Sequence, residues 1–182
     1  MSAVRRKSDA EKPKRLLAID TSASPGFAVI EWGGRINSPR LIYADALKTT
    51  TDHTDAERFT AVHAFASLVC FRYGPFDVVV REHFTKGGSK RATQLVFGGW
   101  SAVDVALKTF GYTIDPANEI TPSAVKKAVG ISGKADKAEV EQGVRQALGL
   151  AEDYVFPNNS GGDSSDATAI AIAYLKREGV ME

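Results

Sequence analysis

Four acidic residues stand at the ends of apolar segments that are suited to burial. Asp20 ends the run LLAID, and Glu82 follows the run DVVVR. Asp163 and Asp166 open the last apolar segment, DSSDATAIAIAYL. Because these two are three residues apart, they share one face if the segment is helical. Each carboxylate could therefore be held rigidly at the edge of a buried element.

Carboxylates that lie close together repel one another and raise one another's pKa, so a cluster is tolerable mainly when it binds cations or shares protons. The sequence has one cysteine and no histidines at metal-ligand spacing. An all-oxygen ligand set favours Mg²⁺, with Mn²⁺ as a substitute. Two such ions about 3.5–4 Å apart are a common means of hydrolysing a phosphodiester. The pattern therefore indicates a metal-dependent nuclease.

Each acidic residue also has an ordinary structural explanation when it is taken alone. Asp163 could cap the N-terminus of a helix, with Asp166 in its first turn. Asp20 could begin an Asx-turn, and Glu82 could be a solvated strand end. His83 is adjacent to Glu82, but we do not expect it to be a ligand, because hard ions prefer oxygen. The four carboxylates together are more specific than any one of them.

Hydrophobic patterning predicts the elements that must position these residues. Strands are expected at 16–19, 27–32, 40–46, 76–81 and 119–121. Helices are expected at 54–73, 89–110, 122–129, 136–148 and 163–178. This order predicts an α/β protein with a mixed sheet covered by helices. Gly98 and Gly99 interrupt the pattern of the second helix, where a second copy of the chain could approach closely.

The composition is that of an ordinary globular protein. The chain has 182 residues, of which 43% are hydrophobic and 25% charged, which argues against disorder and against a fibrous class. No apolar run is long enough to span a membrane, and the basic N-terminus lacks the apolar core of a secretory signal. We expect a basic flexible tail at residues 1–14, one domain at residues 15–182, and an intracellular location.

Four segments resemble the successive motifs of the RuvC family of Holliday-junction resolvases. They are AIDTSASPGFAVIE, VVREHF, PSAVKKAVGISGKADKAEVEQGV and DSSDATAIAIAYL, and they keep the family's order between about residues 16 and 176. The resemblance implies a ribonuclease H-like fold, with a five-stranded mixed sheet of three antiparallel strands followed by parallel strands. It also implies a homodimer that resolves four-way DNA junctions by paired nicks in a bacterial or phage-infected cell.

The resemblance assigns roles to particular residues. Asp20, Glu82, Asp163 and Asp166 would be the catalytic ligands of two Mg²⁺ ions. Lys126 and Lys137 would lie near the scissile phosphate, although a solvated helix face is the ordinary explanation for each lysine. Phe84 would stack on a base at the junction, or it could be a packed loop aromatic. The expected DNA contacts are Phe84, Lys86, Lys90, Arg91, Lys126, Lys127, Lys134 and Lys137.

Two alternatives come from other functional classes. The run LLAIDTSAS also resembles the first strand of actin-like, TsaB-type proteins of tRNA threonylcarbamoyl modification, which act largely as non-catalytic partners. A ribonuclease H-fold protein could also bind branched DNA without cutting it. The acidic pair at residues 163 and 166 argues against the first alternative, and the retention of all four carboxylates argues against the second.

Overall fold

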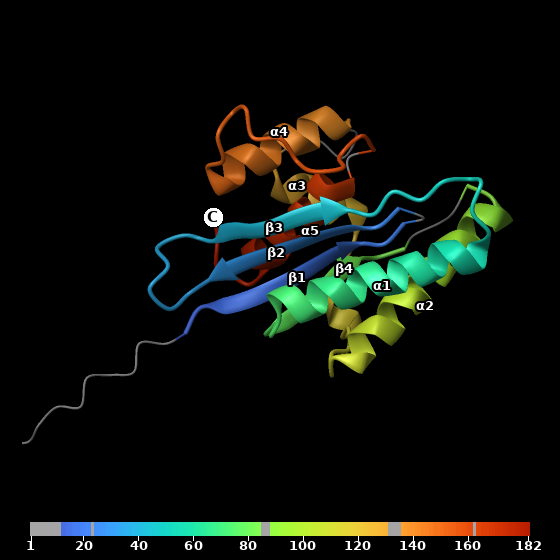
Figure 1. The fold of residues 1–182 in the computed structure, drawn as a ribbon. Coiled ribbons are helices and arrows are strands. Elements are labelled where there is room, and N and C mark those ends of the chain that lie inside the picture. Colours follow the sequence, from blue (N-terminus) through green and yellow to red (C-terminus); the bar gives the residue numbers. More distant parts are fainter. Residues whose placement is uncertain (1–11, 23, 85–87, 131–135, 162) are drawn as a thin grey trace, which may run out of the picture.

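A five-stranded sheet with the strand order β3-β2-β1-β4-β5 forms the centre of the molecule (Figure 1). The computed structural model describes residues 12–22, 24–84, 88–130, 136–161 and 163–182, so most of the predicted tail lies outside the described residues. The strands are β1 Lys14–Asp20, β2 Gly26–Trp32, β3 Arg40–Ala46, β4 Val78–Glu82 and β5 Glu119–Ile120. Strands β1, β2 and β3 pair antiparallel, whereas β4 pairs parallel with β1 and β5. The predicted mixed sheet is confirmed.

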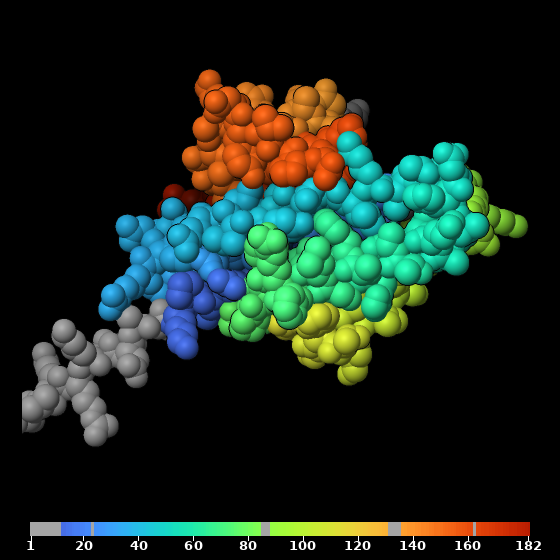
Figure 2. Space-filling view, viewed as in Figure 1, coloured from blue at the N-terminus to red at the C-terminus, as the bar shows by residue number. Residues whose placement is uncertain are grey.

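Helices cover both faces of this sheet. They are α1 Asp55–Tyr73, α2 Lys90–Thr109, α3 Pro122–Ala128, α4 Lys137–Leu148 and α5 Asp163–Arg177, with a 3-10 helix η1 at Pro116–Asn118. Helices α1 and α2 lie on one side, and α3, α4 and α5 lie on the other (Figure 1). In the space-filling view, β3 separates the layer that contains α4 from the layer that contains α1 (Figure 2). None of the described helices has the length and apolarity that a membrane span requires.

Strand alternation divides the buried residues into two cores. Leu17 and Ile19 of β1 pack in the core beneath α1 and α2. Leu16 and Ala18 pack in the core beneath α5, which buries Ile170. The sheet is therefore buried on both faces, as expected for the near-continuous apolar run of a parallel strand. A side chain that follows Ala18 by two residues points to the α5 face.

One edge of the sheet gathers the segments that could carry chemistry. Strands β1 and β4 are parallel, with Ile19 opposite Arg81, so both strands end at this edge. Asp20 is paired with Gly26 at the start of β2. Helix α5 begins at the same place, because the backbone of Asp163 lies directly against Gly26. A β-carbon at Gly26 would overlap the carbonyl oxygen and carbon of Asp163.

The predicted second helix is confirmed, and Gly98 and Gly99 do not break it. Helix α2 is continuous from Lys90 to Thr109, and its glycines accommodate neighbours from the same chain. A β-carbon at Gly98 would overlap the ring of Phe59 in α1, and one at Gly99 would lie 3.1 Å from the carbonyl oxygen of Ser22. This pair of glycines therefore gives no argument for contact with a second copy.

We predict that Gly26→Ala destabilises the protein, because the new methyl group must displace the backbone at the start of α5. The expected loss is roughly 2 kcal/mol or more of unfolding free energy, as for an overpacked core site. Denaturant unfolding measures this loss. Gly88→Ala is the control, because no described heavy atom lies within 4 Å of a β-carbon there. Equal stabilities of the two variants would contradict the close approach of α5.

Candidate active site

Asp20 and Glu82 project from neighbouring strand ends onto the same face of the sheet. Ala18 and Val80 both belong to the core beneath α5, and each carboxylate follows one of them by two residues. Because successive side chains of a strand alternate between faces, Asp20 and Glu82 also point to the α5 side. Both residues are partly buried. The structure thus brings together the two strand-end carboxylates that the sequence singled out.

Asp163 and Asp166 complete the acidic cluster from the first turn of α5. An ordinary helix cap does not account for both residues. The backbone N–H of Ser165 donates to the side-chain oxygen of Asn159 at 3.0 Å, so a residue four positions before the helix caps this turn. The amide of Asn159 also donates to Glu141 of α4 at 2.6 Å. The first turn of α5 is therefore fixed by its surroundings while Asp166 faces the cluster.

The four carboxylates lie close enough to perturb one another. Burial raises the pKa of Asp20 well above its ordinary value, and the charges of Glu82, Asp166 and Asp163 raise it further. Burial, together with the charge of Asp166, raises the pKa of Glu82 to about 7. Burial also raises the pKa values of Asp163 and Asp166. The fold thus holds four carboxylates close together, and their mutual repulsion and burial destabilise the folded protein when they are ionised.

Lys137 places a positive charge beside the cluster. Its Nζ lies 3.3 Å from Oδ2 of Asp166 and 4.0 Å from Oδ1 of Asp163. Lys137 is the first residue of α4, and a capping box between Asp136 and Glu139 fixes the start of that helix. The ADKAEV segment therefore has a local reason to present its lysine at the cluster.

Lys126 lies on the partly buried side of α3 and faces the same cluster. Burial raises the pKa of Glu82 and Asp166, and the positive charge of Lys126 opposes that increase at both carboxyls. The structure thus brings both predicted active-site lysines within electrostatic reach of the acidic cluster. Their placement is more specific than that of lysines on a solvated helix face.

The donor set suits a divalent cation. All four groups are carboxylates, which are the ligands that Mg²⁺ and Mn²⁺ prefer, and the buried negative charge exceeds what Lys137 neutralises. Within the described ranges, however, no three His, Cys, Asp or Glu side chains are grouped so that they could hold a metal ion as they stand. The cluster fits a cation by its charge and chemistry, and side-chain rotation would have to complete the coordination.

Phe84 belongs to an aromatic cluster with two residues from the middle of α2. Its ring lies 5.2 Å from that of Phe97 and 6.4 Å from that of Trp100, in edge-to-face geometry. The exposed fraction of Phe97 is 46%. Phe84 thus packs as a loop aromatic next to an exposed aromatic neighbour.

The basic residues predicted to contact DNA are differently placed. Lys90 is exposed at the start of α2, and Lys127 is exposed on α3. Arg91 forms a bidentate pair with Asp55 of α1, at 2.6 and 2.5 Å, so its charge is already partnered. Lys86 and Lys134 lie outside the described residues.

Sequence analysis missed two residues that shape the site. Asn159 orders the first turn of α5, but its distance from the helix start hides this role. Lys48 opposes the increase that burial causes in the pKa of Asp163. Lys48 follows β3, which ends at the same sheet edge as β1, so the topology could have suggested its position.

Comparison with known proteins identifies the family. The family model described as crossover junction endodeoxyribonuclease RuvC matches residues 16–174. The chain belongs to the RuvC family. The RuvC protein of Chloroflexus aggregans is 34% identical over 161 residues, which are 88% of this chain and 92% of that protein. These matches do not favour the TsaB-type alternative.

Solved RuvC structures share the fold. Thermus thermophilus RuvC superposes with a TM-score of 0.71 at 28% identity, covering 92% of this chain and 98% of that one. The complex of T. thermophilus RuvC with a Holliday junction substrate also gives a TM-score of 0.71, at 26% identity, with 93% and 98% covered. The ribonuclease H-like architecture that the motifs implied is confirmed.

We predict that Glu82→Gln stabilises the metal-free protein at alkaline pH. The pKa of Glu82 is about 7 in the folded protein against an ordinary 4.5, so the folded state loses stability as this carboxyl ionises between those values. The variant avoids that loss, which is on the order of 1–2 kcal/mol after allowance for solvent screening. Thermal unfolding of both proteins in chelator, from about pH 5 to about pH 8, measures the difference. A difference that does not grow with pH would contradict the burial of this charge.

Proposed function

We propose that this RuvC-family protein is a structure-selective endonuclease that resolves four-way DNA junctions by two-metal-ion hydrolysis. The observation that carries the proposal is the convergence of four carboxylates, from β1, β4 and α5, opposite the ammonium group of Lys137. The likeness to a RuvC protein solved with a Holliday junction supports branched DNA as the substrate.

Each residue of the cluster has a distinct task in this proposal. Two bound Mg²⁺ ions, or Mn²⁺ in their place, would supply an activated water and charge stabilisation for the leaving oxygen. The charges of the other three carboxylates all act on Asp20, so we assign it as the ligand that both ions would share. Glu82, Asp163 and Asp166 complete the ligand set. No covalent enzyme intermediate is required, because water is the nucleophile.

The lysines would act on the phosphate. In the free protein, Lys137 is the counter-ion of Asp166, 3.3 Å away. With the carboxylates holding cations, this ammonium group would be free to turn toward the DNA backbone. Lys126 reaches the same cluster from α3. Both can then stabilise the charge that develops on the phosphate during the attack.

The DNA-binding surface would extend from the cluster along α2 and α3. Lys90, Lys127 and the predicted contacts Lys86 and Lys134 would bind phosphates, which provides affinity without sequence selection. Arg91 can join them only by exchanging Asp55 for a phosphate. The aromatic cluster around Phe84 would supply a stacking surface for an unpaired base at the junction.

Paired nicks require two active sites related by symmetry, so we propose a two-fold homodimer. Helix α2 is the proposed contact, because Val105, away from the aromatic cluster, has an exposed fraction of 58%. Sedimentation velocity tests this proposal, and a monomer at the concentrations that cut junctions would contradict it. The expected place of action is the cytoplasm of a bacterial or phage-infected cell, where branched DNA arises.

The experiment that tests the function compares an immobile synthetic four-way junction with a linear duplex of the same arms. We expect symmetric nicks in the junction, only when Mg²⁺ is present, and little cutting of the duplex. Junction binding without nicks would support the non-cleaving module instead. Equal cutting of both substrates would contradict structure selectivity.

We predict that Asp20→Asn lowers the rate of junction cleavage by roughly 100-fold or more, because it removes a shared ligand of the reactive centre. Junction affinity in chelator should stay within about two-fold, since the basic surface is unchanged. Gel-shift and single-turnover nicking assays measure the two quantities. Asp52→Asn, at an exposed loop position, makes the same change in charge and should behave as wild type. Loss of junction binding together with cleavage in folded Asp20→Asn would contradict this division of labour.

A further inference from the structure

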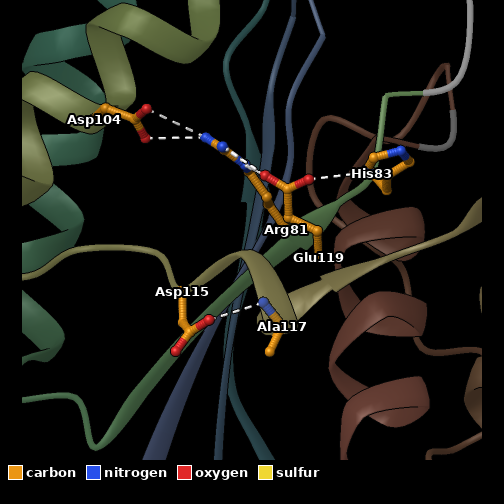
Figure 3. Close-up of polar contacts among 6 residues, drawn as sticks. All are labelled: Arg81, His83, Asp104, Asp115, Ala117 and Glu119. Carbon is orange, nitrogen blue, oxygen red and sulfur yellow. Dashed lines mark hydrogen bonds and ion pairs between the residues drawn. The ribbon is translucent and has the colours of Figure 1, made fainter.

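Glu119 binds both neighbours of Glu82. Its Oε1 accepts hydrogen bonds from Nη2 and Nε of Arg81 at 2.7 and 3.0 Å, and its Oε2 lies 2.8 Å from Nδ1 of His83. Figure 3 shows the carboxylate of Glu119 between the two side chains. One side chain of β5 thus spans the residues on each side of a proposed metal ligand.

We call the contacts of Glu119 with Arg81 and His83 the bridge. Strand geometry explains why the bridge does not involve the side chain of Glu82. Arg81 is paired with Glu119, and Glu82 with Ile120. Residues 81 and 83 point to the α2 face, whereas Glu82 points to the α5 face, because side chains alternate. The bridge therefore acts on the back of the strand and does not occupy the side that carries the acidic cluster.

The bridge reinforces a weak part of the sheet. Strand β5 has only two residues, so few backbone hydrogen bonds hold the end of β4 on that side. The N–H of His83 donates to the carbonyl of Ile120 at 2.8 Å and extends the pairing by one bond. After His83, only side-chain contacts can hold the end of β4 against β5. Glu119 is the described carboxylate that reaches both Arg81 and His83.

The part of the bridge between Arg81 and Glu119 is shielded from water on the α2 side, whereas the side chain of His83 is 48% exposed. The side chains of Arg81 and Glu119 are 11% and 15% exposed. The guanidinium carbon of Arg81 lies 3.8 Å from the ring centroid of Trp100, and its Nη1 contacts Asp104 at 3.0 Å. Burial alone would raise the pKa of Glu119, but hydrogen bonds from His83 and Arg81 hold it below its ordinary value. The carboxylate is therefore ionised, and its hydrogen bonds are charge-assisted.

We propose that Glu119 is a positioning residue that fixes the end of β4 and thereby aims the carboxylate of Glu82 at the divalent cations. The inference rests on the proposed function, because it takes Glu82 to be a ligand. Residues that support a metal ligand from behind commonly change metal affinity by about 10–100-fold when they are altered. Loss of the bridge should therefore weaken metal binding without weakening DNA binding.

The test uses Glu119→Gln, which keeps the side-chain size and removes the charge. Calorimetric titration with Mn²⁺ in the absence of DNA should show affinity about 10-fold weaker than wild type. Junction affinity in chelator should be unchanged within about two-fold. Asp104→Asn is the matched control, because it removes the other carboxylate on Arg81 but does not reach His83, and it should bind Mn²⁺ as wild type does.

A double variant separates positioning from general destabilisation. If Glu119 acts through Glu82, then Glu119→Gln should cause no further loss of Mn²⁺ affinity when Glu82→Gln is already present. Wild-type affinity in Glu119→Gln, an equal loss in Asp104→Asn, or a full additional loss in the double variant would each overturn the inference. Absence of Mn²⁺ binding by the wild-type protein, or wild-type binding by Glu82→Gln, would instead overturn the proposed function on which it rests.

Discussion

The first turn of α5 packs against the ends of β1 and β2, and the site depends on this contact. Gly26 allows the backbone of Asp163 to lie directly on the strand that pairs with Asp20. Buried side chains further along α5, such as Ile170 and Ile172, anchor the helix to the sheet. The apolar core thereby holds together carboxylates that would otherwise move apart. Their raised pKa values are the electrostatic consequence of that packing.

Three lysines from other parts of the chain bring positive charge to the acidic cluster. Lys137 at the start of α4 and Lys126 on α3 approach from the helical layer, and Lys48 follows β3. On the opposite face of the sheet, the ion pairs of Arg81 and Glu119 steady the strand that carries Glu82. A site of this kind needs rigid supports on both faces of the sheet, because small displacements of a ligand weaken metal binding strongly.

Local sequence patterns were sufficient to predict most of the fold and the acidic cluster. The apolar run before Asp20 and the valine run before Glu82 indicate buried parallel strands, and parallel strands that pair side by side end at a common edge. The helix predicted from Asp136 starts where expected, and the resemblance to the RuvC motifs assigned Lys137 at that start to the site. These features are encoded within a few residues of one another, so a single sequence reveals them.

Features that depend on distant partners could not be predicted in this way. Asn159 caps α5 from outside the helix, and Glu119 meets its partners only through the β4–β5 register. The pairing of Arg91 with Asp55 joins two helix starts that are 36 residues apart. Gly98 was interpreted as a point of approach for a second copy, because the ring of Phe59 that it accommodates lies on another helix of the same chain.

The central claim is that Asp20, Glu82, Asp163 and Asp166 together hold divalent cations. Anomalous diffraction from crystals soaked in Mn²⁺ tests it most directly, because manganese scatters anomalously and carboxylates do not. The account predicts two anomalous peaks among these four side chains, with the ammonium group of Lys137 displaced from Asp166. Saturating Mn²⁺ that leaves this cluster without a peak, or that binds only elsewhere on the surface, would contradict it.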